Sequence, residues 1–153
     1  AVIANHMLYH VPDLPQGLRE IQRVLKPGGQ LFAATNGRTH MMALSDLGGR
    51  FDEELRVKRN MVVENFLLEN GHEQLAAYFA TVTCPLYEDA LVVDDAGALV
   101  NYIVSMASTT AQQPTNRQAL QTFVEDEMAA NGGQILIDKA TGLFIARKKA
   151  GGE

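Results

Sequence analysis

The chain has 153 residues, of which 46% are hydrophobic and 20% are charged, and this composition is sufficient for a globular core. Its formal net charge of −5 argues against a nucleic-acid or anionic-membrane partner, because both select clustered Lys and Arg. No apolar run approaches the length of a membrane span, and the single cysteine permits no internal disulfide. We therefore expect a globular chain that resides in the cytoplasm.

The N-terminal part has the pattern of a β-α-β unit. Residues 1–5 form a short, unbroken apolar run, which is typical of a buried strand in a parallel sheet. Apolar residues spaced three and four apart predict an amphipathic helix over 13–26, with Asp13 as its N-cap and Gly28-Gly29 beyond its end. A second strand is predicted over 30–35. A helix between two strands connects them in parallel, so the expected fold class is α/β.

The middle of the chain is predicted to be mainly helical. We expect two helices between 39 and 68, separated at Gly48-Gly49, because paired glycines end helices. The second of them is expected to end near 69–71, and a short helix should follow over 72–79.

The C-terminal part is predicted to return to β structure around two helices. Its expected elements are a strand over 81–93 interrupted near Pro85, a helix capped by Asp94 or Asp95, a polar linker over 109–116 and a helix over 118–131. Two apolar runs, 135–137 and 143–146, are separated by a segment that contains Gly142. This spacing predicts a hairpin with its turn at 138–142, one arm of which should lie antiparallel beside the 30–35 strand or its neighbour.

Two strings of residues resemble a known family. Residues 4–13 read Ala-Asn-His-Met-Leu-Tyr-His-Val-Pro-Asp, and residues 24–31 read Val-Leu-Lys-Pro-Gly-Gly-Gln-Leu. They resemble the class I S-adenosylmethionine-dependent methyltransferases of the ubiquinone/menaquinone-biosynthesis type (methyltransferase type 11), in which they span the fourth strand, its helix and the fifth strand. The resemblance is specific across 1–36 and looser over 37–153.

The resemblance implies a Rossmann-like sheet of parallel strands that ends in an antiparallel pair, with helices on its faces. The segment 37–80 is then a helical insertion over the substrate site. Family members begin with a strand and a glycine-rich turn, followed by a strand that ends in a ribose-binding acid, and neither is found here. We therefore expect residues 1–153 to be the C-terminal half of a methyltransferase domain, inactive as it stands, whose intact protein methylates a small organic acceptor.

The same resemblance implies the roles of individual residues. Asn5 contacts the methionine portion of the cofactor S-adenosylmethionine, and His6 begins the loop that covers it. Tyr9, His10 and Asn36 face the acceptor, and His10 is the catalytic base where the acceptor must lose a proton. Two structural alternatives remain: Asn5 ends the strand by bonding its own backbone, or His10 packs on the helix below it.

Three further expectations concern metals, the cysteine and partners. No carboxylate or third ligand supports His10 and His40 as a metal pair, so no metal site is expected. Cys84 lies among apolar residues and is expected to pack rather than react. An alternative function is a non-catalytic remnant or interaction module, in which the exposed edge of the 1–5 strand forms a homodimer.

Overall fold

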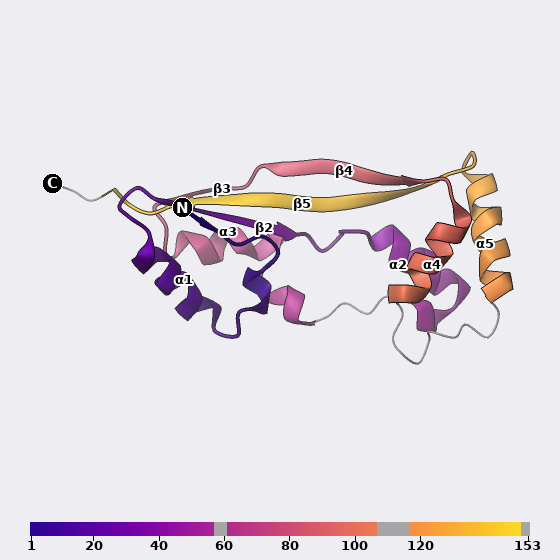
Figure 1. Cartoon of the computed structure of the whole chain (residues 1–153), viewed down its shortest axis with the longest axis horizontal. Helices are drawn as coiled ribbons and strands as arrows, with labels where there is room; N and C mark the ends of the chain where they lie inside the picture. The colour runs from indigo at the N-terminus through magenta and orange to yellow at the C-terminus, as the bar shows by residue number, and fades with distance from the viewer. Residues whose placement is uncertain (57–60, 107–116, 151–153) are drawn as a thin grey trace. The chain divides into compact units, whose positions relative to one another are not determined.

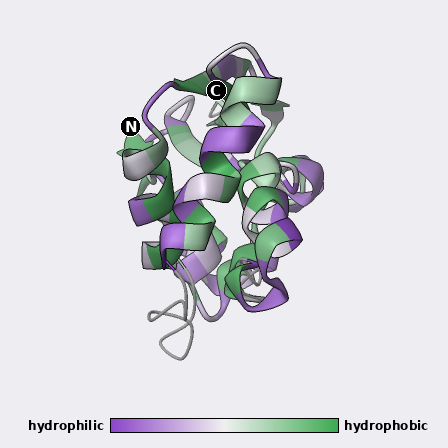
Figure 2. Ribbon diagram, turned by 90° about the vertical axis from the view of Figure 1, so that its right-hand side faces the viewer, coloured by the Kyte–Doolittle hydropathy of each residue, from purple (hydrophilic) through white to green (hydrophobic). Residues whose placement is uncertain are grey.

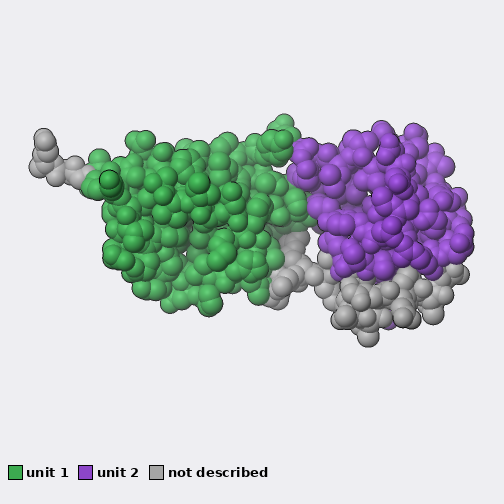
Figure 3. Space-filling model, in the orientation of Figure 1, with its two compact units in different colours: residues 1–40, 59–88, 140–153 green, residues 41–58, 89–139 purple. Residues whose placement is uncertain are grey.

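The computed structural model describes residues 1–56, 61–106 and 117–150, so the expected linker at 109–116 lies outside the described residues. The chain divides into two compact units (Figure 3). Unit 1 contains residues 1–40, 59–88 and 140–153, and unit 2 contains residues 41–58 and 89–139.

A mixed β-sheet forms the frame of unit 1. Strand β1 (Val2–Ile3) lies parallel to β2 (Gln30–Asn36), and β2 lies antiparallel to β5 (Ile135–Arg147). The strand order is β1-β2-β5-β3, with β3 (Thr81–Thr83) antiparallel to β5. Helix α1 (Leu14–Val24) connects β1 to β2 (Figure 1). The predicted β-α-β unit and the α/β class are confirmed.

Helix α1 is fixed at both of its ends. At its start, the backbone N–H of Gln16 donates to Asp13 Oδ1 over 2.9 Å, which confirms the predicted N-cap. At its end, Lys148 Nζ donates to the carbonyl oxygens of Gln22 (2.6 Å) and Leu25 (2.8 Å). A cation at this position also suits the negative end of the helix dipole. The C-terminal segment thus holds the helix that leads into β2.

Both α-helices of unit 1 pack against one face of the sheet. Leu31 and Ala33 of β2 and Phe144 of β5 project from this face and are at most 1% exposed. They form a single cluster with apolar residues of α1 and of α3 (Leu68–Ala76). Phe32 and Ala34, which alternate with them along β2, are half-buried.

The prediction of a buried first strand is wrong at Ile3. Ala4 is 8% exposed, but the Ile3 side chain is 71% exposed. Strand β1 is the terminal strand in the sheet order, so within the described residues its outer edge pairs with no other strand. An apolar sequence therefore did not mean burial on both faces.

The predicted helix boundaries in the middle of the chain are also wrong. Helix α2 (Met42–Phe51) continues through Gly48-Gly49. A Cβ on Gly48 would lie 2.9 Å from the carbonyl oxygen of Leu55, so this glycine permits a close approach rather than ending the helix. Two 3-10 turns follow, η2 (Glu53–Leu55) and η3 (Met61–Asn65).

Helix α3 then begins where a helix end was expected. The side chain of Asn70 accepts from the backbone N–H of Leu67 over 2.7 Å, so it satisfies a donor at the first turn. The helix runs through Gly71, where an added Cβ would lie 2.5 Å from a ring carbon of Phe144. Asn70 therefore stabilises the start of α3, and Gly71 allows the helix to lie close to the sheet.

The C-terminal hairpin was predicted wrongly, because β5 is one continuous strand of 13 residues (Figure 1). Gly142 lies within this strand opposite Thr35, and a Cβ at Gly142 would lie 2.8 Å from the Leu68 side chain. This glycine allows close packing and does not form a turn. The expectation that one of the two apolar runs lies antiparallel beside the 30–35 strand or its neighbour is confirmed, because residues 143–146 pair antiparallel with β2.

The predicted interruption near Pro85 is confirmed. Strand β3 ends at Thr83, and β4 (Leu86–Val93) begins after Pro85. The Pro85 carbonyl accepts from the backbone N–H of Leu143 over 3.0 Å, and β4 also pairs with β5.

Unit 2 packs α2, α4 (Ala96–Met106) and α5 (Arg117–Ala130) around its own core. Hydrophilic and hydrophobic residues alternate along the helical ribbons that Figure 2 shows. Asp95 Oδ1 accepts from the backbone N–H of Ala98 over 2.9 Å, as predicted for the cap of α4. Gly132 and Gly133 have φ values of 73° and 88°, and these left-handed conformations end α5 as expected.

Candidate functional site

The candidate site lies where β1 and β2 end, because the carboxyl ends of parallel strands meet at one edge of a sheet. Beyond the strand itself, the backbone N–H of Ala4 donates to Phe32 O (2.8 Å), and that of His6 donates to Ala34 O (2.9 Å). The side chains of Asn5 and His6 are exposed. His6 has a φ of 50°, a left-handed conformation that is uncommon for a residue with a Cβ and redirects the chain there.

A short 3-10 turn, η1 (Leu8–His10), follows this bend. Leu8 is 3% exposed and anchors the turn in the core of unit 1. The rings of Tyr9 and His10 lie 4.5 Å apart at 53°, with Tyr9 half-buried and His10 exposed. Asn65 Nδ2 donates to the Tyr9 carbonyl over 3.5 Å. The turn therefore presents one imidazole beside a phenol ring.

The end of β2 carries two polar residues with different roles. Thr35 is fully buried, and its hydroxyl donates to the Phe66 carbonyl over 2.9 Å. Asn36 is half-buried and lies opposite Thr141 of β5, whose hydroxyl donates to Asn36 Oδ1 over 3.1 Å. The Thr141 oxygen also lies 3.5 Å from His40 Nδ1. Thr35 thus fixes the core, whereas Asn36 belongs to a polar group at the strand end.

The loop after β2 is held by backbone and acidic groups of unit 1. Gly37 N donates to the Ala140 carbonyl over 2.9 Å. The backbone N–H of Arg38 donates to Glu69 Oε1 (2.8 Å), and its guanidinium forms an ion pair with Glu64 (2.7 Å). These contacts fix the loop between Asn36 and His40.

The structure arranges the predicted site residues in two groups. Asn5, His6, Tyr9 and His10 follow β1, and Asn36 lies at the end of β2. The backbone bond from His6 to Ala34 connects the two strand ends. Among the described residues, no side-chain hydrogen bond or ring contact joins Asn36 to the first group.

The sequence of this segment matches a known family. The family model described as "Methyltransferase domain" matches residues 1–33, which include β1, η1, α1 and the first part of β2. This range includes most of the segment in which the specific resemblance was found. The N-terminal segment is therefore similar in sequence to this methyltransferase family over those residues.

Solved structures resemble the chain at low sequence identity. A protein of Bacillus halodurans C-125 named as a candidate methyltransferase is 16% identical, with a TM-score of 0.48. The YcgJ protein of Bacillus subtilis is 15% identical, with a TM-score of 0.46. Haemonchus contortus phosphoethanolamine N-methyltransferase 2, in complex with S-adenosyl-L-methionine, is 17% identical, with a TM-score of 0.43. No curated protein sequence matches the chain.

The chain spans only part of the length of these solved structures. In each comparison 97% of this chain is covered, but only 64% of the two Bacillus proteins and 33% of the Haemonchus protein. The chain therefore spans less than two thirds of their length.

Two residues of this region were missed by the sequence reasoning. Thr141 was assigned to a turn, although it lies in β5 and bonds Asn36. Glu69, expected near a helix end, lies in the first turn of α3, and its carboxylate accepts a hydrogen bond from the backbone N–H of Arg38. Both contacts join residues far apart in the sequence, so only correct strand and helix boundaries would have indicated them.

Other features of the chain bear on the chemistry that it could support. Over residues 1–56, 61–106 and 117–150, no group of three or more His, Cys, Asp or Glu side chains could hold a metal ion. The helices within these ranges are too short or too polar to cross a membrane. Cys84 packs against the core of unit 1, and this burial raises the pKa of its thiol. A hollow in unit 2 is lined by none of the predicted site residues.

Proposed function

We propose that the protein to which this chain belongs transfers a methyl group from S-adenosylmethionine to a small organic acceptor. The observation that carries the proposal is the parallel β1-α1-β2 unit, most of which the methyltransferase family model matches. This unit leaves Asn5 and His6 exposed at the carboxyl end of β1. Open α/β sheets bind their ligands at this edge. Because the chain spans only part of its relatives, the activity is proposed for a protein of their length.

The residues after β1 fit the methionine end of the cofactor. The exposed carboxamide of Asn5 offers both donors and an acceptor to the ammonium and carboxylate groups of an amino acid. The left-handed bend at His6, held by its bond to Ala34, starts a loop that can cover this end. When bound, the cofactor supplies the methyl group that is transferred.

Tyr9, His10 and Asn36 are proposed to orient the acceptor. Methyl transfer depends on alignment of the acceptor and exclusion of water, so a half-buried phenol and an anchored carboxamide are suitable groups. His10 is the proposed proton acceptor where the methylated atom carries a proton, because its imidazole is exposed and lies beside the tilted Tyr9 ring. The helical segment 37–80 is proposed to contribute to the substrate site.

A second candidate function rests on the exposed Ile3. An apolar side chain that is 71% exposed on a terminal strand offers an edge to which a second copy could pair. In that case the chain is a non-catalytic interaction module. Sedimentation of the purified chain separates the two candidates, because only the second predicts a dimer that is lost on Ile3→Lys.

The proposed function is tested by calorimetric titration with S-adenosylmethionine. The protein is extended upstream to the length of the Bacillus relatives, and Asn5→Ala is expected to weaken binding by about ten-fold or more, because a hydrogen bond to a charged group contributes about 1.5–3 kcal/mol. Asn101→Ala, at an exposed position of α4, is the matched control. Equal affinities of the Asn5→Ala and Asn101→Ala proteins would exclude Asn5 from the cofactor site.

A separate measurement tests the acceptor side. His10→Ala should lower kcat and leave the cofactor Kd unchanged. Undiminished turnover of an acceptor that must lose a proton would remove His10 as the base. The 153-residue chain alone is expected to give no saturable signal at micromolar cofactor, because the entropic cost of fixing the ligand is then offset by contacts to one end only.

A further inference from the structure

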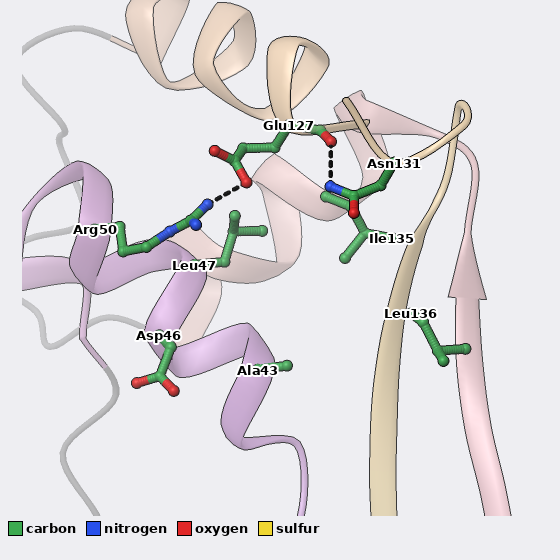
Figure 4. A pocket seen from close by; sticks show the side chains of 8 residues that line it. All are labelled: Ala43, Asp46, Leu47, Arg50, Glu127, Asn131, Ile135 and Leu136. Carbon is green, nitrogen blue, oxygen red and sulfur yellow. Dashed lines mark hydrogen bonds and ion pairs between the residues drawn. The ribbon is translucent and has the colours of Figure 1, made fainter. Parts of the chain in front are cut away.

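Unit 2 contains a hollow of about 400 Å³, bounded by α2, the end of α5 and the start of β5 (Figure 4). Its volume falls within the roughly 300–1,000 Å³ that is usual for small-molecule sites. Four apolar and four polar residues line it: Ala43, Leu47, Ile135, Leu136, Asp46, Arg50, Glu127 and Asn131. The hollow therefore combines an apolar wall with polar groups.

The apolar wall is continuous with the core of unit 2. Leu47 is 6% exposed and belongs to that core, and Ile135 packs against it. In Figure 4 these two side chains lie between α2 and β5, in the middle of the lining residues. Because their surroundings are packed, the wall is fixed in position and can receive the apolar body of a ligand.

The guanidinium of Arg50 already has partners. It forms an ion pair with Glu127, which links α2 to α5 across the hollow (Figure 4). It also lies 5.6 Å from the centre of the Phe123 ring, a cation–π arrangement. An anionic ligand would have to displace Glu127 and leave that carboxylate without its counter-charge. The hollow is therefore poorly suited to an anion.

Acceptor oxygens remain available around the hollow. Asn131 uses its amide nitrogen to bond the Glu127 carbonyl at 2.7 Å. Within the described ranges, its amide oxygen and the second carboxylate oxygen of Glu127 have no hydrogen-bond partner. Both carboxylates of the lining are ion-paired, Asp46 with Arg56 at 2.6 Å and Glu127 with Arg50, so the preference for a cation rests on the two acceptor oxygens. The whole chain carries −5, so its long-range field also attracts cations.

We propose that this hollow is a binding site for a small organic cation, in which an ammonium group is attached to an apolar body. The ammonium donates to the free oxygens of Glu127 and Asn131, and the body lies on Leu47 and Ile135. None of the residues proposed for methyl transfer lines the hollow, so the site stands independently of that function.

The test titrates the chain with three probes of similar shape, phenethylamine, phenethyl alcohol and hydrocinnamate, and follows backbone amide resonances by NMR. Phenethylamine should give saturable shifts in the millimolar range or below, confined to the lining segments of α2, α5 and β5. The neutral alcohol and the carboxylate should bind at least ten-fold more weakly. Equal binding of all three probes, shifts elsewhere in the chain or no binding at all would overturn the proposal.

Two variants locate the charge that selects the cation. Glu127→Gln should lower the affinity for phenethylamine about ten-fold and leave that for phenethyl alcohol unchanged. Glu125→Gln changes an exposed acid on the same helix that does not line the hollow, and should change neither affinity. An unchanged preference for the amine in Glu127→Gln would refute the assigned role of Glu127. If that variant fails to fold, the comparison of the three probes on the unaltered chain decides.

Discussion

Gly71 is the contact at which a single added methyl group should be most informative. A Cβ at this position would lie 2.5 and 2.7 Å from two ring carbons of Phe144 and 3.0 Å from Phe66, whereas carbon atoms pack best about 3.5–4.0 Å apart. The Phe144 ring, 1% exposed, would have to move by about 1 Å. Such overpacking costs about 1–3 kcal/mol, and the upper part of this range, about 2–3 kcal/mol, applies here because both contacts with the buried Phe144 ring are shorter than 3.0 Å. The better helix propensity of Ala returns about 1 kcal/mol. Gly71→Ala should therefore lower the free energy of unfolding by about 1–2 kcal/mol.

A double-mutant cycle tests this explanation directly. Phe144→Leu removes the two ring carbons that the new methyl group would meet, so in that background Gly71→Ala should cost at least about 1 kcal/mol less. Urea unfolding followed by far-UV circular dichroism measures both values. His72→Ala, on the exposed side of α3, should stay within about 0.5 kcal/mol of the original chain. Additive effects of Gly71→Ala and Phe144→Leu, or a Gly71→Ala chain as stable as the original, would refute the reasoning.

Two further predictions concern the same unit. Thr35→Val should lower the free energy of unfolding by about 1–3 kcal/mol, because it leaves the buried Phe66 carbonyl without its donor; a Val variant as stable as the original chain in urea would contradict the role of this bond. Burial raises the pKa of the Cys84 thiol, so folding favours the protonated form of this thiol. The resulting contribution to the free energy of unfolding is fully present below the unfolded thiol pKa of about 8.5, and it is lost as pH rises through the higher folded pKa. The urea midpoint should therefore fall less above this pH in Cys84→Ala than in the original chain, and identical pH profiles would show that Cys84 is not the group responsible.

The β-α-β unit could be predicted because its signals are local. Asp13 precedes the apolar spacing of α1 by one position, and Gly28 follows its end with a φ of 72°. Local sequence also found the interruption at Pro85 and the cap at Asp95. In each case the residue acts on its own backbone or on the next turn, so no knowledge of distant neighbours was needed.

Three glycines beyond β2 misled the prediction because their role depends on distant residues. Gly48, Gly71 and Gly142 were interpreted as breaks, but each allows a close contact, with Leu55, Phe144 and Leu68 respectively. Such a contact exists only after the chain has folded, and sequence alone does not distinguish it from a turn. The bond between Thr141 and Asn36 was missed for the same reason.

The continuity of β5 explains how one misinterpreted segment affected both the fold and the site. Its buried residue in unit 2 is Ile137, at an odd position, whereas in unit 1 the buried positions are even: Gly142, Phe144 and Ala146. The alternation thus changes phase along a single strand, and a change of phase looks like two short strands joined by a turn. Because side chains alternate between the faces of a sheet, a slip of one residue in the β2–β5 register would exchange Phe144 for a neighbour. The same slip would separate Thr141 from Asn36, so core packing and the polar group at the end of β2 depend on one register.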